Sequence, residues 1–293
     1  MNLFCCAAAA APASAVMSVT GNTGSSGELL YTVRNGSAAV TGCTGEPSYL
    51  GIPQFIGGYQ VTLIADEAFS GCSSLRHISL PEGLCAIGDK SFYACSHLES
   101  IVIPDSVITL GEGCFCGCGE LRALSIPDGI RTIPGSAFRA CVSLSEVTLP
   151  DSVCTLGSCA FSGCGKLGSV RLGSGLSEIG SYAFYMCPEL RTLWIPDSVT
   201  YIGEYAFGYS SPSPDSGATL LSGSSAAKKY AADNLISYTD TGDTVPAAAL
   251  TGISGRRLGR SLPLPLLIVI SIIITIFILR LSLQNRKLKK RKY

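Results

Sequence analysis

The sequence predicts a solenoid, a fold in which short repeats stack along one axis and each repeat contacts only its neighbours. Three columns of residues recur between Val61 and Phe207 at one fixed period, which equals the interval from Phe69 to Phe92. A period of this size is typical of a solenoid, because a single repeat cannot bury its apolar side without the repeats beside it. The phenylalanine column consists of Phe69, Phe92, Phe115, Phe138, Phe161, Phe184 and Phe207. The cysteine and leucine columns follow at steps of three residues and consist of Cys72, Cys95, Cys118, Cys141, Cys164 and Cys187, then Leu75, Leu98, Leu121, Leu144, Leu167 and Leu190.

The composition suits a long body of short strands and tight turns, since only 14% of the 293 residues are charged and 33 are glycine. The net charge of zero conceals an asymmetry between the two ends. Of the 21 Lys and Arg residues, 10 follow residue 250 and 11 precede it, whereas all 21 Asp and Glu residues precede it. We therefore expect an acidic body and a basic end that occupy different environments.

The first 15 residues are predicted to be a signal peptide. They are rich in alanine and end in Ala13-Ser14-Ala15, which has the small-x-small form of a signal-peptidase site. They lack the basic residues that normally begin a signal peptide, so an unstructured start is the alternative. Residues 16–27 are rich in Gly, Ser and Thr and are predicted to be a linker.

Residues 28–63 are predicted to form an N-terminal hairpin and a capping coil. Two β-prone runs flank Asn35-Gly36, and this dipeptide between such runs is the strongest short signal for a hairpin. The first coil is longer than the later ones, because the interval from Pro53 to Pro81 exceeds the interval from Pro81 to Pro104. We expect the extra residues around Gly57-Gly58 to bulge from the capping coil.

Each repeat is predicted to contain one strand and a less regular second half. In a representative repeat, Ile101 and Ile103 alternate with outward positions, which is the pattern of a strand. Pro104 ends this strand because proline cannot donate a hydrogen bond to a continuing ladder. A second short extended segment is expected at Val107 to Leu110, followed by a single helical or 3₁₀ turn from Phe115 to Cys118.

The 14 cysteines raise the question of a disulfide framework. Six of them occupy one column beside apolar columns, where small buried thiols suit the packing. Neighbouring members of the column lie within the Cα range of a disulfide, but equivalent side chains on stacked coils point in parallel. We predict buried free thiols, with disulfides between neighbouring coils as the alternative.

The repeated phrase Ile-Pro-Asp-Ser-Val-x-x-Leu/Ile-Gly-x-x-Ala-Phe-x-x-Cys-x-x-Leu resembles the BspA-type (Treponema-type) leucine-rich repeat. It is clearest from Ile195 to Phe207, joined to the preceding Cys187 and Leu190. The resemblance covers residues 28–238 and implies a right-handed leucine-rich-repeat solenoid, with a parallel β-sheet on one face and irregular or short extended segments on the other. Three positions depart from the phrase, namely Gly173 for the turn proline, Pro134 for the turn glycine and Ser210 for a seventh column cysteine.

The resemblance also sets the expected boundaries of the array. The repeats should occupy residues 64–207 and a C-terminal cap residues 208–238, in which residues 225–234 form a short helix before a last strand at 236–238. It further implies display on the cell surface and attachment to proteins of a host or a neighbouring cell.

The C-terminal region is predicted to anchor the chain in a membrane. Residues 239–261 form a tether, and residues 262–283 form a transmembrane helix that carries no charge from Leu262 to Leu279. The basic tail at 284–293 places the C-terminus in the cytoplasm by the positive-inside rule, and the solenoid outside. The alternative is a buried core helix, which a basic tail and an apolar surface all round disfavour. No Leu-Pro-x-Thr-Gly motif of a cell-wall sorting signal precedes this span.

No pattern of catalytic residues is present, so we expect a protein that is not an enzyme, uses no cofactor and binds no nucleic acid. A zinc site of His77 and His97 with Cys72 and Cys95 is a weaker hypothesis, because the cysteines belong to a core column that continues without histidine. A cation bound by a stacked column of turn acids is likewise weaker than a simple preference of Asp for the turn. These acids are Glu82, Asp105, Asp128, Asp151 and Asp197.

The outward face of the sheet is the predicted binding surface. Trp194 beside Arg171 is a combination enriched at the centres of protein interfaces, although Trp194 could instead pack under the C-terminal cap. The candidate ligand-binding residues, which lie between the inward apolar residues of each strand, are Trp194, Arg171, Thr192, Glu146, Thr148, Val102 and His77.

These features together predict a single-span membrane protein whose ectodomain adheres to a protein or other macromolecule on a host or neighbouring cell. A rigid solenoid would supply distributed contacts, with affinity from a few anchor residues. The alternative is a structural surface spacer or coat protein without a specific ligand.

Overall fold

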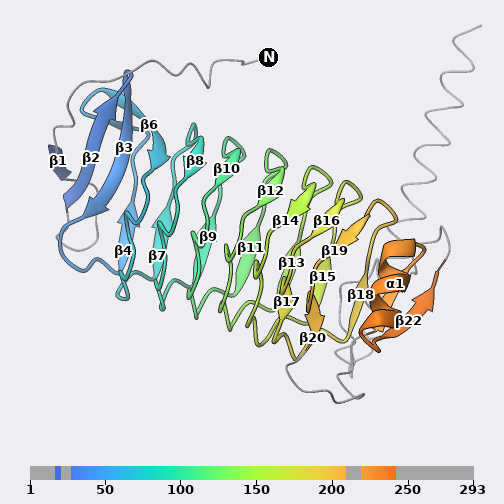
Figure 1. The fold of residues 1–293 in the computed structure, drawn as a ribbon. Coiled ribbons are helices and arrows are strands. Elements are labelled where there is room, and N and C mark those ends of the chain that lie inside the picture. Colours follow the sequence, from blue (N-terminus) through green and yellow to red (C-terminus); the bar gives the residue numbers. More distant parts are fainter. Residues whose placement is uncertain (1–16, 21–27, 209–218, 242–293) are drawn as a thin grey trace, which may run out of the picture. The chain divides into compact units, whose positions relative to one another are not determined.

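The computed structural model describes residues 17–20, 28–208 and 219–241, all of which belong to one compact unit spanning Met1–Gly252. Within these residues the chain winds into successive coils that each add one short strand to a parallel sheet (Figure 1). The predicted leucine-rich-repeat solenoid is therefore confirmed.

The main sheet has six parallel strands in the order β15-β13-β11-β9-β7-β4. Each strand is three residues long because a proline-containing turn follows it in most coils. The middle residue of every strand faces the core and the two outer residues face outward, as the alternation predicted. The strands are β4 (Tyr49–Gly51), β7 (His77–Ser79), β9 (Ser100–Val102), β11 (Ala123–Ser125), β13 (Glu146–Thr148) and β15 (Ser169–Arg171).

A second set of two-residue parallel strands runs along the opposite side of each coil, where a second extended segment was expected. It divides into two sheets, because β10 does not pair with β12. In the other coils a turn glycine donates its N–H to the coil before it, as Gly111 does to the Ile87 carbonyl at 2.8 Å. Pro134 stands at this position beside the break and has no N–H to donate. The strands are β8 (Ala86–Ile87), β10 (Thr109–Leu110), β12 (Thr132–Ile133), β14 (Thr155–Leu156), β16 (Glu178–Ile179) and β19 (Tyr201–Ile202).

The phenylalanine column forms a continuous stack of rings inside the coils. Neighbouring ring centroids are 5.2–5.6 Å apart, and Phe115 lies within 3° of parallel to Phe138. The backbone beside each ring forms a third ladder, in which the N–H of one coil donates to a carbonyl of the next coil, as Phe115 does to Ala137 at 2.8 Å. The segment from Phe115 to Cys118 contains hydrogen-bonded turns and no assigned helix. In the last two coils the same ladder is regular enough to form β17 (Phe184–Tyr185) and β20 (Phe207–Gly208).

The described cysteines are free thiols, as predicted. From the second repeat onward each column cysteine donates its thiol to the carbonyl of the phenylalanine in the coil before, at 3.1–3.3 Å. These donors are Cys95, Cys118, Cys141, Cys164 and Cys187, which bond to Phe69, Phe92, Phe115, Phe138 and Phe161 respectively. The column is therefore a ladder of buried hydrogen bonds as well as an apolar column.

The N-terminal cap contains the predicted hairpin of β2 (Glu28–Arg34) and β3 (Ser37–Cys43). Asn35 and Gly36 in its turn both have positive φ, at 51° and 77°, which is the conformation that an Asn-Gly turn favours. A second hairpin joins β5 (Phe55–Ile56) to β6 (Tyr59–Ile64) through Gly57-Gly58, where a bulge was expected.

The segment predicted to be a linker contains the strand β1 (Met17–Thr20), which pairs antiparallel with β2. Its Gly, Ser and Thr content concealed this, because an antiparallel strand depends chiefly on the unpaired edge that β2 offers.

At its C-terminal end the solenoid continues into the cap, where β18 (Thr192–Trp194) of the repeats pairs with β21 (Thr219–Ser222), which in turn pairs with β22 (Ser237–Asp240), in a parallel sheet of their own. The helix α1 (Ser225–Asp233) begins at Ser224, whose side chain accepts a hydrogen bond from the Ala227 N–H. The predicted helix is therefore present, and the last strand extends to Asp240 rather than ending at residue 238.

Several predictions lie outside the described residues, including the signal peptide at 1–15, the transmembrane helix at 262–283, the basic tail at 284–293 and most of the tether at 239–261. Across residues 17–20, 28–208 and 219–241, no helix has the length and apolar character needed to cross a membrane.

Candidate functional site

The outward side chains of the main sheet form two rows, because strand register places equivalent residues side by side. In one row Val102 is the register partner of Ser125, Ser125 of Thr148, and Thr148 of Arg171. All four side chains are exposed, and Val102 has 75% of its surface accessible. The structure therefore brings three predicted ligand-binding residues, Val102, Thr148 and Arg171, into one row that we call the sheet row.

The other row holds His77 and Glu146, which are exposed at the first positions of their strands. The His77 Nδ1 lies 3.4 Å from the Ser100 hydroxyl of the next strand, and Glu146 is the register partner of Ser169. Two strands separate these two predicted residues, so they lie on the same face but do not form one cluster.

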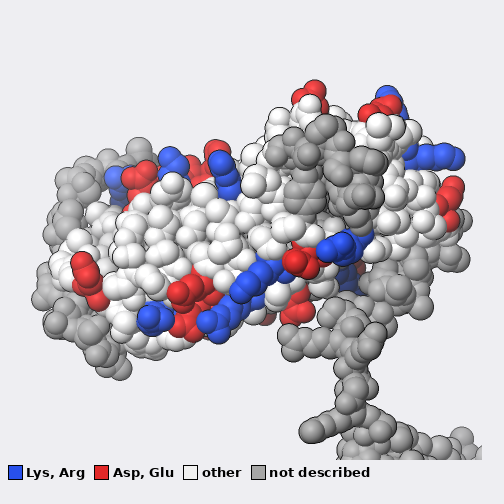
Figure 2. All heavy atoms as spheres, turned by 90° about the horizontal axis from the view of Figure 1, so that it is seen from below, with Lys and Arg blue, Asp and Glu red and all other residues white. Residues whose placement is uncertain are grey.

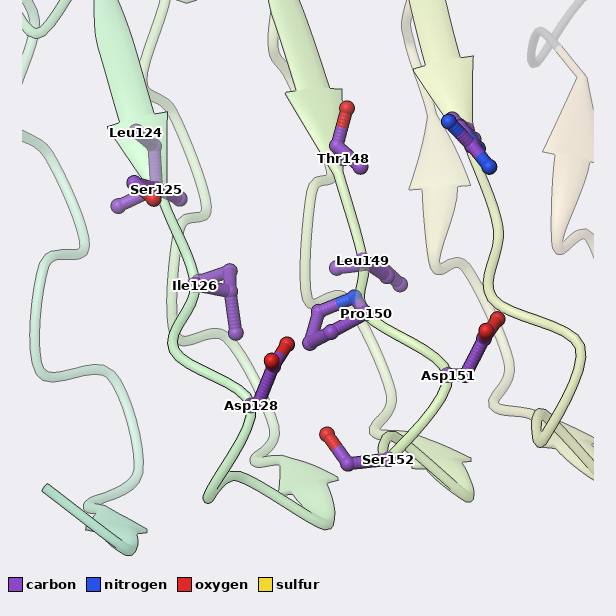
Figure 3. A pocket seen from close by; sticks show the side chains of 10 residues that line it. Leu124, Ser125, Ile126, Asp128, Thr148, Leu149, Pro150, Asp151 and Ser152 are labelled. Atoms are coloured by element: carbon purple, nitrogen blue, oxygen red, sulfur yellow. The ribbon is translucent and has the colours of Figure 1, made fainter. Parts of the chain in front are cut away.

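A shallow groove of about 570 Å³ opens where the sheet row meets the turns that follow β11 and β13. Figure 3 shows Asp128 and Asp151 extending from these two turns, with Thr148 at the end of β13. The groove thus places carboxylates and hydroxyl groups beside a guanidinium group. Its lining consists of Leu124, Ser125, Ile126, Asp128, Thr148, Leu149, Pro150, Asp151, Ser152 and Arg171.

The carboxylate of Asp151 is fixed in position by the next coil. Its Oδ1 accepts a hydrogen bond of 2.7 Å from the Ser174 N–H. This bond is the main reason that the pKa of the Asp151 carboxyl lies below its ordinary value, and the nearby Arg171 guanidinium adds to the shift. Asp151 therefore keeps its negative charge to a lower pH than an ordinary aspartate.

The turn acids have a structural role that the sequence pattern alone did not define. Asp197 accepts from the Gly223 N–H at 3.1 Å, much as Asp151 accepts from Ser174, so these two acids link successive segments of the solenoid. Among the described residues no three His, Cys, Asp or Glu side chains are arranged to hold a metal ion. In particular, His97 Nδ1 lies 2.6 Å from the Ser73 carbonyl, and the thiol of Cys95 bonds to the Phe69 carbonyl.

Trp194 and Thr192 belong to a different hydrogen-bonded sheet from Arg171. Their strand β18 pairs with β21, so that Trp194 lies opposite Leu221 and is only half-buried. Trp194 is thus partly covered. This state is intermediate between the exposed side chain and the side chain packed under the cap that the sequence allowed. β18 nevertheless lies next to β15, the strand of Arg171, although the two are not paired as strands of one sheet.

A band of ion pairs borders the N-terminal half of the sheet. Arg76 binds Glu99 at 3.0 Å and lies 3.9 Å from Glu120, which in turn lies 3.9 Å from His97. Figure 2 shows basic and acidic side chains alternating along the face in view, next to a broad uncharged area. The described surface in this view therefore carries no large field of one sign.

Two exposed tyrosines away from the sheet face were not predicted from the sequence. Tyr182 and Tyr205 occupy equivalent positions of neighbouring repeats, and their rings stack at 5.3 Å. Tyr205 is 53% exposed and lines a hollow of about 390 Å³ together with Glu204 and Asp233. The sequence does place the two tyrosines one repeat apart. This spacing indicates an exposed pair only when the column is known to face outward.

Comparison with known families agrees with this geometry. Residues 51–153 and 132–214 match the family profile described as "BspA type Leucine rich repeat region", with six copies of the repeat. The two ranges together span more than half of the chain. The chain belongs to the BspA-type leucine-rich repeat family. The resemblance inferred from the repeated phrase is confirmed.

Solved structures similar to this BspA-type chain come from several bacteria. A leucine rich cell surface protein from Faecalibacterium prausnitzii is 28% identical with a TM-score of 0.61, over 72% of this chain and 56% of that one. A leucine-rich repeat protein from Bacteroides ovatus is 28% identical with a TM-score of 0.56, over 66% and 59%. The leucine-rich repeat protein of T. pallidum is 25% identical with a TM-score of 0.55, over 72% and 95%.

The BspA-type chain thus covers little more than half the length of the first two of these proteins. No curated protein matches its sequence.

Proposed function

We propose that this BspA-type protein is a cell-surface binding protein that uses the sheet row and its groove to hold a protein ligand of a host or neighbouring cell. The observation that carries the proposal is the register-aligned row of exposed side chains from Val102 to Arg171, which ends at a groove bearing two carboxylates, of which Asp151 is held by the next coil. A surface location is supported by the cell-surface protein among the similar structures.

The chemistry of the groove suits recognition of a polypeptide. Arg171 offers a forked donor for a carboxylate or a carbonyl, while Asp128 and Asp151 accept from basic side chains or backbone N–H groups. Ser125 and Thr148 add hydroxyl groups that both donate and accept. Val102, with its exposed apolar side chain, gives the row a contact for an apolar residue of the ligand.

The role that we propose is binding rather than catalysis. The groove residues have hydroxyl groups and carboxylates but no histidine, lysine or cysteine among them, so a hydroxyl nucleophile there has no neighbouring base of those types. We also propose that residues 262–283 anchor the protein in a membrane as a single span, with the basic tail in the cytoplasm and the solenoid outside.

The test is binding of the purified full-length protein, in a mild detergent, to immobilised host extracellular matrix proteins. Arg171→Glu reverses the charge at the groove and should weaken binding by about tenfold or more, because a mismatched charge at a contact site disfavours the complex. Trp194→Ala tests whether the half-buried ring contributes an anchor.

The matched control is Arg131→Glu, which makes the same charge reversal at an exposed arginine before β12, on the opposite side of the coil. We expect it to leave binding unchanged. If Arg171→Glu and Trp194→Ala bind as well as the native protein, the sheet face is not the binding surface. Failure of the native protein to bind any of the matrix proteins would favour the spacer role.

A further inference from the structure

Two cysteines in the N-terminal cap face each other across the junction between the hairpin and the first repeat. Cys43 is the last residue of β3, and Cys72 is the first member of the cysteine column. Both side chains are half-buried against the core, and their thiols are hydrogen-bonded to each other. The segments that carry them are packed closely, since a Cβ added at Gly42 would lie 3.0 Å from the Ala68 carbonyl oxygen.

Cys72 differs from the rest of the column because it lies in the first repeat. Each later member, such as Cys95, donates to the carbonyl of the phenylalanine in the preceding coil. No repeat precedes the coil of Cys72, so the phenylalanine carbonyl is missing there and the Cys43 thiol is its partner instead. Side chains at equivalent positions of stacked coils point in parallel, which keeps the thiols of column neighbours from facing each other. Cys43 and Cys72 occupy non-equivalent positions, so this restriction does not apply to them.

The pair has the chemistry needed for thiol exchange. The hydrogen bond from Cys43 lowers the pKa of Cys72 to about 7, so that a large fraction is thiolate at neutral pH. Burial instead raises the pKa of Cys95 and Cys187 to about 12. Cys72 is therefore the more nucleophilic thiol at the cap. Cys43 is placed to attack the mixed disulfide that Cys72 forms.

We propose that Cys43 and Cys72 form a disulfide that joins the hairpin cap to the first repeat. The oxidant is a low-molecular-weight disulfide such as oxidised glutathione. The Cys72 thiolate attacks one sulfur of the oxidant, breaking its S–S bond and releasing one thiolate, which takes up the proton that Cys72 lost. Cys43 then loses its proton and attacks the Cys72 sulfur, releasing the second thiol. The protein loses two protons and two electrons, and one oxidant becomes two thiols.

The disulfide would fasten the N-terminal cap to the first repeat, at the end of the array where no further repeat covers the core. The link ties β3 to the turn after Phe69 and closes a loop of the chain between residues 43 and 72. Ligand binding at the sheet row does not depend on this link, so the two proposals can be tested independently.

The test uses purified full-length protein in a mild detergent, first reduced and then incubated at neutral pH with oxidised glutathione. Remaining thiols are alkylated, and the protein is cut after glutamate residues. Because Glu46 precedes a proline and resists cleavage, Cys43 lies in fragment 29–67 and Cys72 in fragment 68–82. We expect mass spectrometry to find these two fragments joined, and to find them separate after reduction.

Three variants and a competing product make the result decisive. Cys95→Ser should leave the joined fragments unchanged, whereas Cys43→Ser and Cys72→Ser should abolish them. In Cys43→Ser, Cys72 should remain as its mixed disulfide with glutathione, and in Cys72→Ser, Cys43 should be alkylated. Circular dichroism of each variant would show that the fold is retained. Alkylation of both Cys43 and Cys72 in the native protein would overturn the proposal. So would fragment 68–82 joined to fragment 83–99, which would show pairing with Cys85 or Cys95.

Discussion

The members of the cysteine column are identical in sequence but differ in chemistry according to what precedes each of them. Cys118, Cys141 and Cys164 are buried and bond to phenylalanine carbonyls, and burial raises the pKa of each thiol well above its ordinary value. Cys72 lies at the edge of the column beside another thiol. A position in a repeat thus fixes the packing of a residue, while its neighbours fix its reactivity.

Cys72 should be alkylated faster than the other described cysteines at neutral pH. Its pKa of about 7 is lowered by the Cys43 thiol, so its thiolate is lost as the pH falls below 7 and is fully formed above. The rate at Cys72 should therefore rise through a midpoint near pH 7 and then level off. Brief pulses of iodoacetamide at a series of pH values, read by mass spectrometry of fragment 68–82, measure this profile.

The comparison variant for this profile is Cys43→Ala, which removes the hydrogen bond and leaves no hydroxyl in its place. The midpoint should then move upward, toward the ordinary range of a thiol. An unchanged midpoint in this variant would show that Cys43 does not set the acidity of Cys72.

The sequence predicted the core at the residue scale because a residue that recurs on every coil is buried on every coil. All seven column phenylalanines are indeed buried. It could not predict the partner of Cys72, because Cys43 belongs to the hairpin and follows no repeat. The half-buried state of Trp194 could not be predicted from the sequence either, because it depends on β21, a strand that follows the last repeat.

At the scale of elements, the second parallel ladder depends on glycines that allow one coil to approach the next. A Cβ added at Gly157 would lie 2.6 Å from the Gly135 nitrogen and 2.7 Å from the Pro134 carbonyl carbon. These are backbone atoms of the preceding coil, so they cannot move aside without disturbing the pairing of β12 with β14.

Gly157→Ala should therefore lower the free energy of unfolding by about 1–3 kcal/mol, the usual cost of forcing an extra methyl group into a packed site. Gly119→Ala is the matched control, because its added Cβ would lie 3.6 Å from the nearest atom, the Ser96 carbonyl oxygen. Urea unfolding followed by circular dichroism measures both variants. Equal midpoints for the two would contradict the close approach at Gly157.

The strands and the Asn-Gly hairpin could be predicted because local alternation and turn residues specify them. The break between β10 and β12 could not, although Pro134 was recognised as a departure from the phrase. Its consequence depends on a hydrogen bond between neighbouring coils, and a sequence pattern within one repeat does not reveal such bonds. The strand β1 was missed for a similar reason, because its pairing with β2 is not encoded in its own composition.

For the whole molecule, the contrast between an acidic body and a basic end leads to a prediction about topology. With residues 262–283 as a single span, protease added to intact cells should digest the solenoid and leave a C-terminal epitope tag protected. Antibody against the tag should bind only after the cells are permeabilised. A protected solenoid, or a tag that is accessible on intact cells, would contradict the proposed orientation.

The backbone ladder beside the phenylalanine stack has a direction along the array. Every N–H in it donates toward the following coil, from Glu67 in the first repeat to Met186 near the end. The ladder on the opposite side of each coil runs the other way, because its turn glycines donate to the preceding coil, as Gly111 does to the Ile87 carbonyl. At the last coil the Phe207 N–H, which has no following coil to bond to, donates a hydrogen bond of 3.2 Å to the Tyr230 hydroxyl. The C-terminal end of this ladder therefore presents N–H donors, and the cap that covers it supplies an acceptor in Tyr230.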